Sequence, residues 1–395
     1  MARLEEICSL ITDGSHFSPE DEGVGYPMFS VKDMTPNGFN ISECKKIGEE
    51  AYKKLVANGC KPLNDDVVVA KDGSYLKTAF VIKGNPEIAL LSSIAILRPK
   101  IDLVIPEYLS YFLKSDAVYR TVSLNYITGT ALKRIILKGI RKIEVDLPDI
   151  GEQEQRAQRL SKVDYLCQLR KQQLAKLDEL VKARFVEIFG DSVANTKNFP
   201  STTLETVMTV FPQNGLYKPQ TDYVQDDTGI PILRIDAFYN GKVTNWNTLK
   251  RLICSETEID RYLLRENDIV INRVNSIEYL GKCAHIVGLK EKTVFESNMM
   301  RFHMDEKKVN AVYITEVLCT EGIYRQILRR AKKSVNQASI NQEDVKSLEI
   351  LVPPLSLQNQ FAAFVERVDQ QKQSVQQSLE KLELMKKALM QEYFG

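Results

Sequence analysis

Residues 148–190 read PDIGEQEQRAQRLSKVDYLCQLRKQQLAKLDELVKARFVEIFG, and residues 353–395 read PPLSLQNQFAAFVERVDQQKQSVQQSLEKLELMKKALMQEYFG. The two segments align without a gap at an offset of 205 positions, and the match begins upstream, at residues 129 and 334. Each segment has apolar residues at a spacing of three and four, which is typical of a long helix with a coiled-coil seam. The seam residues are Leu160, Val163, Cys167, Leu174, Leu177, Val181 and Ile188 in the first copy, and Val365, Val368, Val375, Leu379, Leu382, Leu389 and Tyr393 in the second.

Four charged residues interrupt the two seams: Arg170 and Arg184 in the first copy, Lys372 and Lys386 in the second. At 1.5 Å per residue each helix would be roughly 55 Å long. Two isolated helices of this kind would expose their seams to water, so we expect them to pair with each other, antiparallel, as a spacer. An apolar stripe does not identify the surface against which it packs. The alternative is therefore that each helix packs onto its own domain.

The duplication extends through the whole chain, although the earlier parts of each half match more loosely. Asp13-Gly14 corresponds to Asn214-Gly215, and the strand-like segment 66–71 corresponds to 268–273. One half therefore consists of a variable globular domain followed by a better-matched helix. We predict a first domain at 1–148, a first long helix at 149–190, a second domain at 191–353 and a second long helix at 354–395.

Each globular domain is predicted to be α/β with a mixed sheet. Short β-branched runs at 66–70, 79–82 and 143–147 are separated by turn signals, as expected of strands. Residues 106–119 instead carry apolar side chains at helical spacing after a proline suited to a first turn, and 312–328 is their counterpart.

Composition excludes several classes of protein. A content of 44% hydrophobic and 27% charged residues is typical of a globular protein, and no apolar run of about 18 residues predicts a membrane span. The seven cysteines contain no C-x-x-C pair, so we expect reduced, mostly buried thiols. We therefore expect a cytoplasmic protein without membrane contact. The net charge of +1 means that any nucleic-acid contact must come from local basic patches.

Motifs of catalysis are missing from the sequence. It contains no G-x-x-x-x-G-K-[ST] motif for ATP, no glycine-rich turn for an adenine cofactor and no N-P-P-aromatic motif of adenine methyltransferases. Only three histidines are present, at His16, His285 and His303, which leaves little for acid–base or metal chemistry. We expect no catalytic and no metal-binding residues, and a binding role is favoured.

Positive charge gathers in matching places of the two halves. The stretch between Glu321 and Glu343 has five basic residues and no acid, and a second basic run lies between Asp116 and Glu144. Such clusters can contact DNA phosphates, although a charge run is often only a solvated face. The candidates for this role are Lys133, Arg134, Arg329, Arg330, Lys332 and Lys333.

Two loops in each half are candidates for reading base edges. Residues 12–16 pair with 213–218, and 71–77 pair with 273–276 and, a little further on, with Lys282. A turn glycine flanked by polar or basic residues suits close approach to DNA, and a surface turn without a ligand is the competing interpretation. The candidates are Ser15, His16, Lys71, Lys77, Gln213, Asn214, Lys218, Arg273 and Asn275.

Taken together, these motifs resemble the specificity subunits of type I restriction-modification systems over nearly the whole chain. The family-like features are D-G-x-H-x-x-P at 13–19, G-x-P at 25–27 and 229–231, and the P-x-x-x-x-Q opening of each long helix at 148–153 and 353–358. Each motif is weak alone, and two copies in the same order are a strong signal. The second copy departs from the pattern with Tyr217 where the first has His16.

The resemblance implies that each domain reads one half of a split, asymmetric double-stranded DNA target and that the helices set the gap between the halves. It also implies a non-catalytic adaptor that binds two modification subunits and, through them, restriction subunits. S-adenosylmethionine, ATP and Mg would then be held by those partners and not by this chain. Two alternatives stay open: an assembly subunit of the same family without specific DNA binding, and a DNA-methylating enzyme with unfamiliar motifs.

Overall fold

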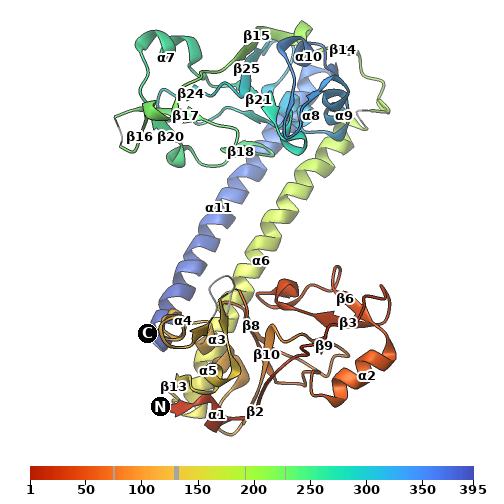
Figure 1. Cartoon of the computed structure of the whole chain (residues 1–395). Helices are drawn as coiled ribbons and strands as arrows, with labels where there is room; N and C mark the ends of the chain where they lie inside the picture. Colours follow the sequence, from red (N-terminus) through yellow and green to blue (C-terminus); the bar gives the residue numbers. More distant parts are fainter. Residues whose placement is uncertain (74–75, 129–132, 192, 227) are drawn as a thin grey trace. The chain divides into compact units, whose positions relative to one another are not determined.

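The computed structural model describes residues 1–73, 76–128, 133–191, 193–226 and 228–395. Residues 129–132, at the start of the duplicated segment, and Ser74 and Tyr75 of a predicted reading loop lie outside these ranges. The chain forms two compact units: unit 1 comprises Met1–Gln173 and Val375–Gly395, and unit 2 comprises Leu174–Ser374. Each unit has an α/β body and one part of each of two long helices, α6 (Ile150–Phe189) and α11 (Leu355–Phe394) (Figure 1).

Within each unit the two long helices run side by side in opposite chain directions (Figure 1). In unit 1, Arg170 Nε donates to Ser378 Oγ at 3.2 Å, and Lys386 pairs with Asp164 at 2.5 Å. In unit 2, Lys372 pairs with Asp178. Three of the four charges that interrupt the seams thus bind a polar partner on the other helix, and this confirms the predicted antiparallel pair.

The C-terminal end of each long helix also packs into a body, and this is the body of the other copy rather than the helix's own. In unit 1 the Phe394 ring lies 5.2 Å from the Tyr108 ring, between their centroids. In unit 2 the Phe189 ring lies 4.6 Å from Tyr313 and 5.5 Å from Phe361. Each body therefore buries aromatic side chains of the long helices in its core.

The P-x-x-x-x-Q motif has the same structural role in both units. The Gln153 side chain is buried, accepts from the backbone N–H of Ile105 at 3.0 Å and donates to the carbonyl of Pro148 at 2.9 Å. Gln358 does the same with Asn310 and Pro353, at 2.9 and 2.7 Å. A buried amide that satisfies both backbone groups fixes where each long helix begins.

The body of unit 1 is built on an antiparallel four-stranded sheet in the order β2-β10-β7-β8, from Cys8–Asp13, Ile94–Pro99, Val67–Ala70 and Ala79–Val81. A smaller sheet, β6-β3-β9, comes from Lys45–Ile47, Tyr26–Phe29 and Ala89–Leu90. Three strand pairs complete the unit: β1 (Ala2–Arg3) with β13 (Glu144–Val145), β4 (Met34–Thr35) with β5 (Gly38–Phe39), and β11 (Ile127–Thr128) with β12 (Arg134–Ile135). Its helices are α1 (Leu4–Ile7), α2 (Glu49–Ala57), α3 (Pro106–Leu113), α4 (Asp116–Asn125) and α5 (Leu137–Arg141).

Unit 2 repeats this plan with a larger main sheet, β15-β25-β21-β23-β19-β18, from Met208–Asn214, Met299–Met304, Asp268–Asn272, Cys283–His285, Gly241–Val243 and Phe238–Tyr239. A second sheet, β16-β20-β17-β24, comes from Tyr223–Val224, Lys250–Leu252, Ile230–Leu233 and Val294–Phe295. Two small sheets are β14-β28, from Ser201–Thr203 and Glu349–Leu351, and β22-β27-β26, from Val274–Asn275, Ala338–Ser339 and Lys332–Lys333. The short helices are α7 (Glu256–Tyr262), α8 (Ala311–Leu318), α9 (Glu321–Arg330) and α10 (Gln342–Lys346). The predicted fold class, two similar mixed α/β bodies with two long helices, is confirmed.

The single helix predicted in each body is wrong, because a pair of helices occupies its place. In unit 1 the helix is interrupted between α3 and α4. There the Ser115 side chain accepts a hydrogen bond from the Val118 N–H at 3.3 Å and caps the second helix. Thr320 plays the same part between α8 and α9. A hydroxyl that caps a helix competes with helix continuation, and an apolar pattern does not reveal this.

Among the described residues, no helix combines the length and the apolar character needed to cross a membrane.

Candidate DNA interface

One end of the main sheet carries the predicted reading loops in both units. In unit 1, β2 ends at Asp13 opposite Ala95, and β7 ends at Ala70 opposite Ile94, so the loops that follow β2 and β7 leave the sheet at the same end. In unit 2, β15 ends at Asn214 opposite Met300, and β21 ends at Asn272 opposite Met299. We call this the loop end of each sheet.

In unit 2 the basic run joins the loop end as a β-hairpin. Strand β26 pairs with β27, with Lys333 opposite Ala338, and β27 pairs with β22, with Ser339 opposite Val274. Since β22 directly follows Arg273, the small sheet brings Arg273 and Asn275 together with Lys332 and Lys333. Two groups of predicted residues that are distant in sequence are thus neighbours.

Unit 1 has the same arrangement. Strands β11 and β12 form the corresponding hairpin, and Asp72 makes an isolated antiparallel bridge with Arg134. The N–H of Gly73 donates to the Lys133 carbonyl at 2.9 Å, and that of Ile135 donates to the Lys71 carbonyl at 3.0 Å. The loop after β7 and the basic hairpin are therefore held together by backbone bonds, as in unit 2.

Many of the predicted basic side chains at this end are exposed. Lys133, Arg134, Lys332 and Lys333 all lie on the surface of their hairpins. Lys77 is also exposed, and its ammonium lies 5.2 Å from the centroid of the Tyr119 ring. These side chains are placed where a phosphate could reach them, and their contact with DNA stays a prediction.

The two arginines of α9 differ from each other. Arg329 is exposed, whereas the Arg330 guanidinium donates to the Ser347 carbonyl at 3.1 Å and to the Gln326 carbonyl at 3.0 Å. Arg330 thus links the end of α9 to the end of α10. Its charge serves the fold at this position, and a phosphate contact would have to compete with these bonds.

Two further predicted residues, Lys71 and Lys218, are already bonded within the chain. The Lys71 ammonium is buried and pairs with Asp13, which ties the loops after β2 and β7 together. Lys218 pairs with Glu258 at 2.9 Å and with Asp222 at 3.4 Å. The hydrogen bond to Glu258 is the main cause that raises the pKa of Lys218, and Asp222 adds to it. Lys218 therefore keeps its positive charge, which the two carboxylates neutralise locally.

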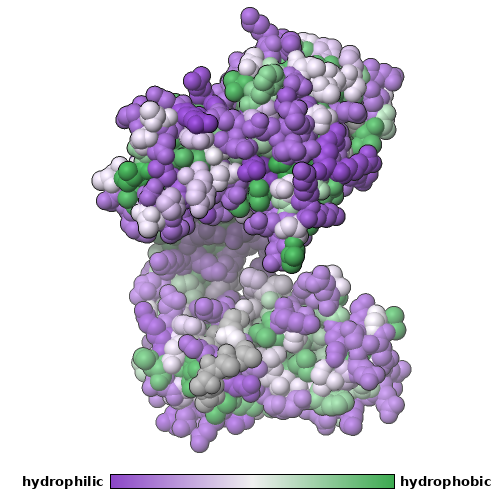
Figure 2. All heavy atoms as spheres, turned by 45° about the horizontal axis from the view of Figure 1, so that its top comes forward, coloured by the Kyte–Doolittle hydropathy of each residue, from purple (hydrophilic) through white to green (hydrophobic). Residues whose placement is uncertain are grey.

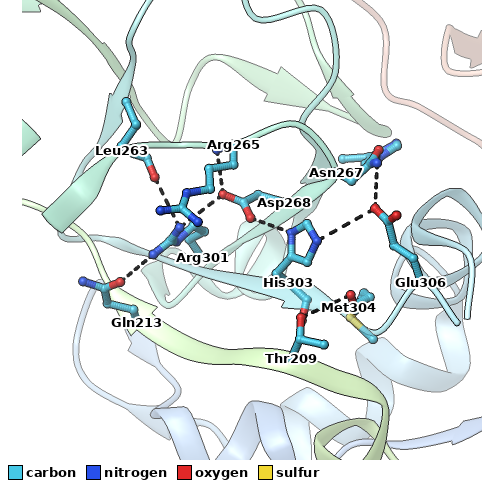
Figure 3. A network of polar contacts seen from close by, with 11 residues as sticks. Thr209, Gln213, Leu263, Arg265, Asn267, Asp268, Arg301, His303, Met304 and Glu306 are labelled. Atoms are coloured by element: carbon cyan, nitrogen blue, oxygen red, sulfur yellow. Dashed lines mark hydrogen bonds and ion pairs between the residues drawn. The ribbon is translucent and has the colours of Figure 1, made fainter. Parts of the chain in front are cut away.

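Gln213 belongs to a polar network that surrounds the buried carboxylate of Asp268 (Figure 3). Asp268 accepts from His303 Nδ1 at 2.9 Å and from Arg301 at 3.4 Å. Arg301 in turn donates to Gln213 Oε1 at 2.7 Å, and Gln213 donates to the Arg261 carbonyl at 3.1 Å. The network fixes the Gln213 amide next to the exposed Asn214.

The loop after β2 exposes one of its two candidates. The Ser15 hydroxyl is turned inward and donates to the Phe17 carbonyl at 2.6 Å. The His16 side chain is 80% exposed and lies 3.7 Å from Asp13 Oδ1. His16 is therefore accessible to a ligand, whereas Ser15 shapes its own turn.

The glycines of these loops have a role within the fold. A Cβ on Gly14 would lie 2.1 Å from the Leu90 carbonyl oxygen, and one on Gly215 would lie 2.2 Å from that of Glu296. Both glycines let the chain pass a neighbouring backbone, so their presence is explained without close approach to DNA.

Arg273 and Asn275 follow β21 at the loop end. Arg273 donates to the Ser297 carbonyl at 3.0 Å, while its Nε is buried without a partner. The Asn275 side chain accepts from the N–H of Ser276 at 2.8 Å, which leaves its amide N–H groups available as donors.

Family comparison agrees with this layout. The model of the type I restriction modification DNA specificity domain matches residues 1–179 and again 199–384. The chain belongs to this family. The two matches explain the duplication, since each specificity domain covers one globular body and most of the long helix that follows it.

Relatives named as specificity subunits match part of the chain. The EcoKI specificity subunit of Escherichia coli is 24% identical over 337 residues, 80% of this chain and 70% of the relative. A protein of Methanocaldococcus jannaschii named as a specificity subunit of type I restriction enzyme MjaX is 30% identical over 46% of this chain and 42% of its own length. The chain thus spans less than half of the archaeal relative. In fold it is similar to the type I S subunit from M. genitalium, with a TM-score of 0.60 at 14% identity over 100% of this chain and 95% of the other.

Two further residues lie at the loop end of the second specificity domain: Lys282, which belongs to the predicted reading loops, and Val335, which no sequence motif singled out. Lys282 follows the turn beside Asn272, and its ammonium lies 3.3 Å from the Tyr239 ring centroid and 5.4 Å from that of Tyr279. Burial against these rings lowers the pKa of Lys282. Val335, in the turn of the β26–β27 hairpin, is 98% exposed. An apolar residue between Ser334 and Asn336 was the only sequence signal for it.

The face of the specificity domains seen in Figure 2 is mainly polar. On the face seen in Figure 2, hydrophilic residues cover most of the surface, and hydrophobic residues form small scattered patches. Within the described ranges, no group of three or more histidine, cysteine, aspartate or glutamate side chains is arranged to hold a metal ion. The recurring feature of the two domains is thus a polar loop end with a basic hairpin.

Proposed function

We propose that the chain is the DNA-reading subunit of a type I restriction-modification complex, and that the loop end of each unit reads one half of a split, asymmetric target. The observation behind this proposal is that the same juxtaposition recurs in both units. In each, the loop after the matching sheet strand, β7 in unit 1 and β21 in unit 2, is bonded to a basic hairpin, although the side chains presented differ. A repeated scaffold with different surfaces suits recognition of two different half-sites.

In this proposal the hairpin lysines and arginines contact phosphates, and loop side chains such as Asn275 and His16 read base edges. Phosphate contacts supply affinity and register, whereas bonds to base edges supply sequence preference. Asn275 suits adenine, to which an amide can bond in a bidentate manner. Lys71, Lys218 and Arg330 then support the loops from inside rather than contact DNA.

The helical pair of α6 and α11 would set the gap between the half-sites and dock two modification subunits. Restriction subunits would join through those partners. The chain itself would be non-catalytic and would act in the cytoplasm, with S-adenosylmethionine, ATP and Mg held by the partner subunits. The specificity names of the family and of its relatives support the adaptor role.

Selection of bound duplexes from a random library tests the proposal. The chain is used alone and in complex with a modification subunit, and the library contains variable gaps. We expect two short, unrelated half-sites separated by a fixed gap. Binding without any sequence preference in the assembled complex would instead identify an assembly subunit, and methylation by the chain alone would identify an enzyme.

A further inference from the structure

The turn of the β26–β27 hairpin has an unusual residue at its centre. The N–H of Ser334 donates to the Gln337 carbonyl at 2.7 Å, so Val335 and Asn336 are the two central residues of a tight turn. Val335 is 98% exposed, and its side chain therefore adds almost nothing to the core.

Nothing in the turn calls for a valine. Two-residue hairpin turns usually contain glycine, asparagine or aspartate, because the turn types that match strand twist require positive φ. Val335 and Asn336 do not have positive φ values, so the backbone admits a valine, but its side chain gains nothing from a turn that leaves it in water. The fold gives no reason for a valine here, and this favours a contact outside the chain.

The surroundings of Val335 suit DNA as that contact. The turn follows directly after the exposed Lys332 and Lys333, and the hairpin is attached through β22 to the segment that holds Arg273 and Asn275. A two-stranded β-ribbon fits the major groove of B-DNA, where lysines beside the turn can reach the phosphates on either side.

In the major groove, the feature that an aliphatic side chain recognises is the C5 methyl group of thymine. Side chains that wedge between base pairs are longer, such as phenylalanine, leucine or methionine. The two methyl groups of valine lie directly on Cβ, so they can cover a methyl group at the groove surface but are too short to enter the base stack.

We propose that Val335 is a specificity-determining residue that contacts a thymine methyl group in the half-site read by unit 2. This inference rests on the proposed function and adds the base and the chemical group that are recognised. It predicts that one thymine of that half-site is distinguished by its methyl group.

The test uses the chain in complex with its modification subunit and the duplex obtained by selection. Each thymine of the target is replaced in turn by deoxyuridine, which lacks only the methyl group, and affinity is measured with wild type and with Val335→Ala. Wild type should bind about fourfold more weakly when one particular thymine is replaced, as expected for one buried methyl group. Val335→Ala should bind thymine and deoxyuridine duplexes equally at that position.

Val287→Ala is the matched control, since Val287 is half exposed and lies beyond the Asp268 end of β21, opposite the loop end. This variant should keep the full wild-type preference for thymine. The inference is overturned if no thymine is sensitive in the wild type, or if Val335→Ala keeps the same preference. A wild-type complex that selects a specific target but shows no such thymine refutes the inference and leaves the proposed function standing, whereas the absence of any selected target refutes both.

Discussion

The two units hold the same buried carboxylate with different partners. In unit 1, Asp66, directly before β7, accepts two hydrogen bonds from Arg98, at 2.8 and 2.9 Å. In unit 2, the corresponding Asp268 is shared by His303 and Arg301. Both acids also accept a backbone N–H three residues earlier, at 2.7 and 2.8 Å. The acid is kept because it closes a turn, while its cationic partners are free to change.

The change of partner connects the acid to the loop end in unit 2. Arg301 reaches Gln213, whereas the Arg98 guanidinium in unit 1 is one-third exposed. The loops differ as well. Unit 1 joins its two loops through the buried Asp13–Lys71 pair, and unit 2 has Asn214 and Arg273 at the matching positions, with Arg273 bonded to a carbonyl. Similar scaffolds therefore position their loops by different polar contacts.

The largest expected effect is on the stability of unit 2. Asp268→Ala leaves Arg301 without its carboxylate in a site where that arginine side chain is only 10% exposed, so we expect a loss of about 3–5 kcal/mol in the free energy of unfolding. Asp66→Ala should cost less, because Arg98 can turn into water. Urea unfolding monitored by hydrogen exchange reports each unit separately, and Asp236→Ala, which removes an exposed acid, is the control. Equal losses in the two units would contradict this comparison.

A smaller effect is expected from acid. Burial lowers the pKa of His285 to about 4, against an ordinary value of 6.5, in surroundings that include Glu266, Glu306, Lys242 and His303. The unfolded chain therefore takes up a proton at higher pH than the folded one, and stability that is complete above pH 6.5 is lost as the pH falls toward 4.

The loss should be about 3 kcal/mol, from 1.36 kcal/mol per pKa unit. It should fall on unit 2, because the position of unit 1 that matches His285 in strand pairing is Val81. Thermal unfolding between pH 7 and pH 4 measures it. His285→Gln should reduce the pH dependence, and the exposed His16→Gln should leave it unchanged. An unchanged pH profile in His285→Gln would show that other groups govern the acid response.

The smallest expected effect is electrostatic. Lys332→Ala and Lys333→Ala should each weaken binding of the assembled complex about equally on matched and mismatched DNA. Each should also lower the slope of log affinity against log salt by about one. Lys307→Ala removes an exposed charge beyond the opposite end of β25 and should leave the slope unchanged. Slopes that stay at the wild-type value in both hairpin variants would place this hairpin away from DNA.

The repeat and the long helices could be predicted from the sequence, because their signals are local and periodic. Seam residues such as Leu160 and Val365 are buried as the spacing indicates. The break between α3 and α4 was not predicted, since it depends on one hydroxyl in an otherwise apolar pattern. Local sequence signals thus predict that a helix is present better than they predict where it begins and ends.

The candidate site was harder to predict, because a basic residue in the sequence does not reveal its partner in space. Lys71 and Arg330 are of the residue types that contact DNA, yet Lys71 pairs with Asp13 and Arg330 donates to backbone carbonyls. Conversely, Val335 carries no charge and is marked only by its exposure at a turn. The loop and the hairpin meet at one end of the sheet because strands some 60 residues apart in the sequence pair with each other. No local sequence pattern indicates such a pairing.

The central claim is that each unit reads its own half-site through its loop and hairpin. It is tested most directly by replacing residues 332–339 with the sequence of 127–134 and selecting bound duplexes with the complete complex. We predict that one half-site changes while the other half-site and the gap stay the same. Selection of the wild-type target in both halves, or a change in both halves at once by a folded variant, would contradict the account.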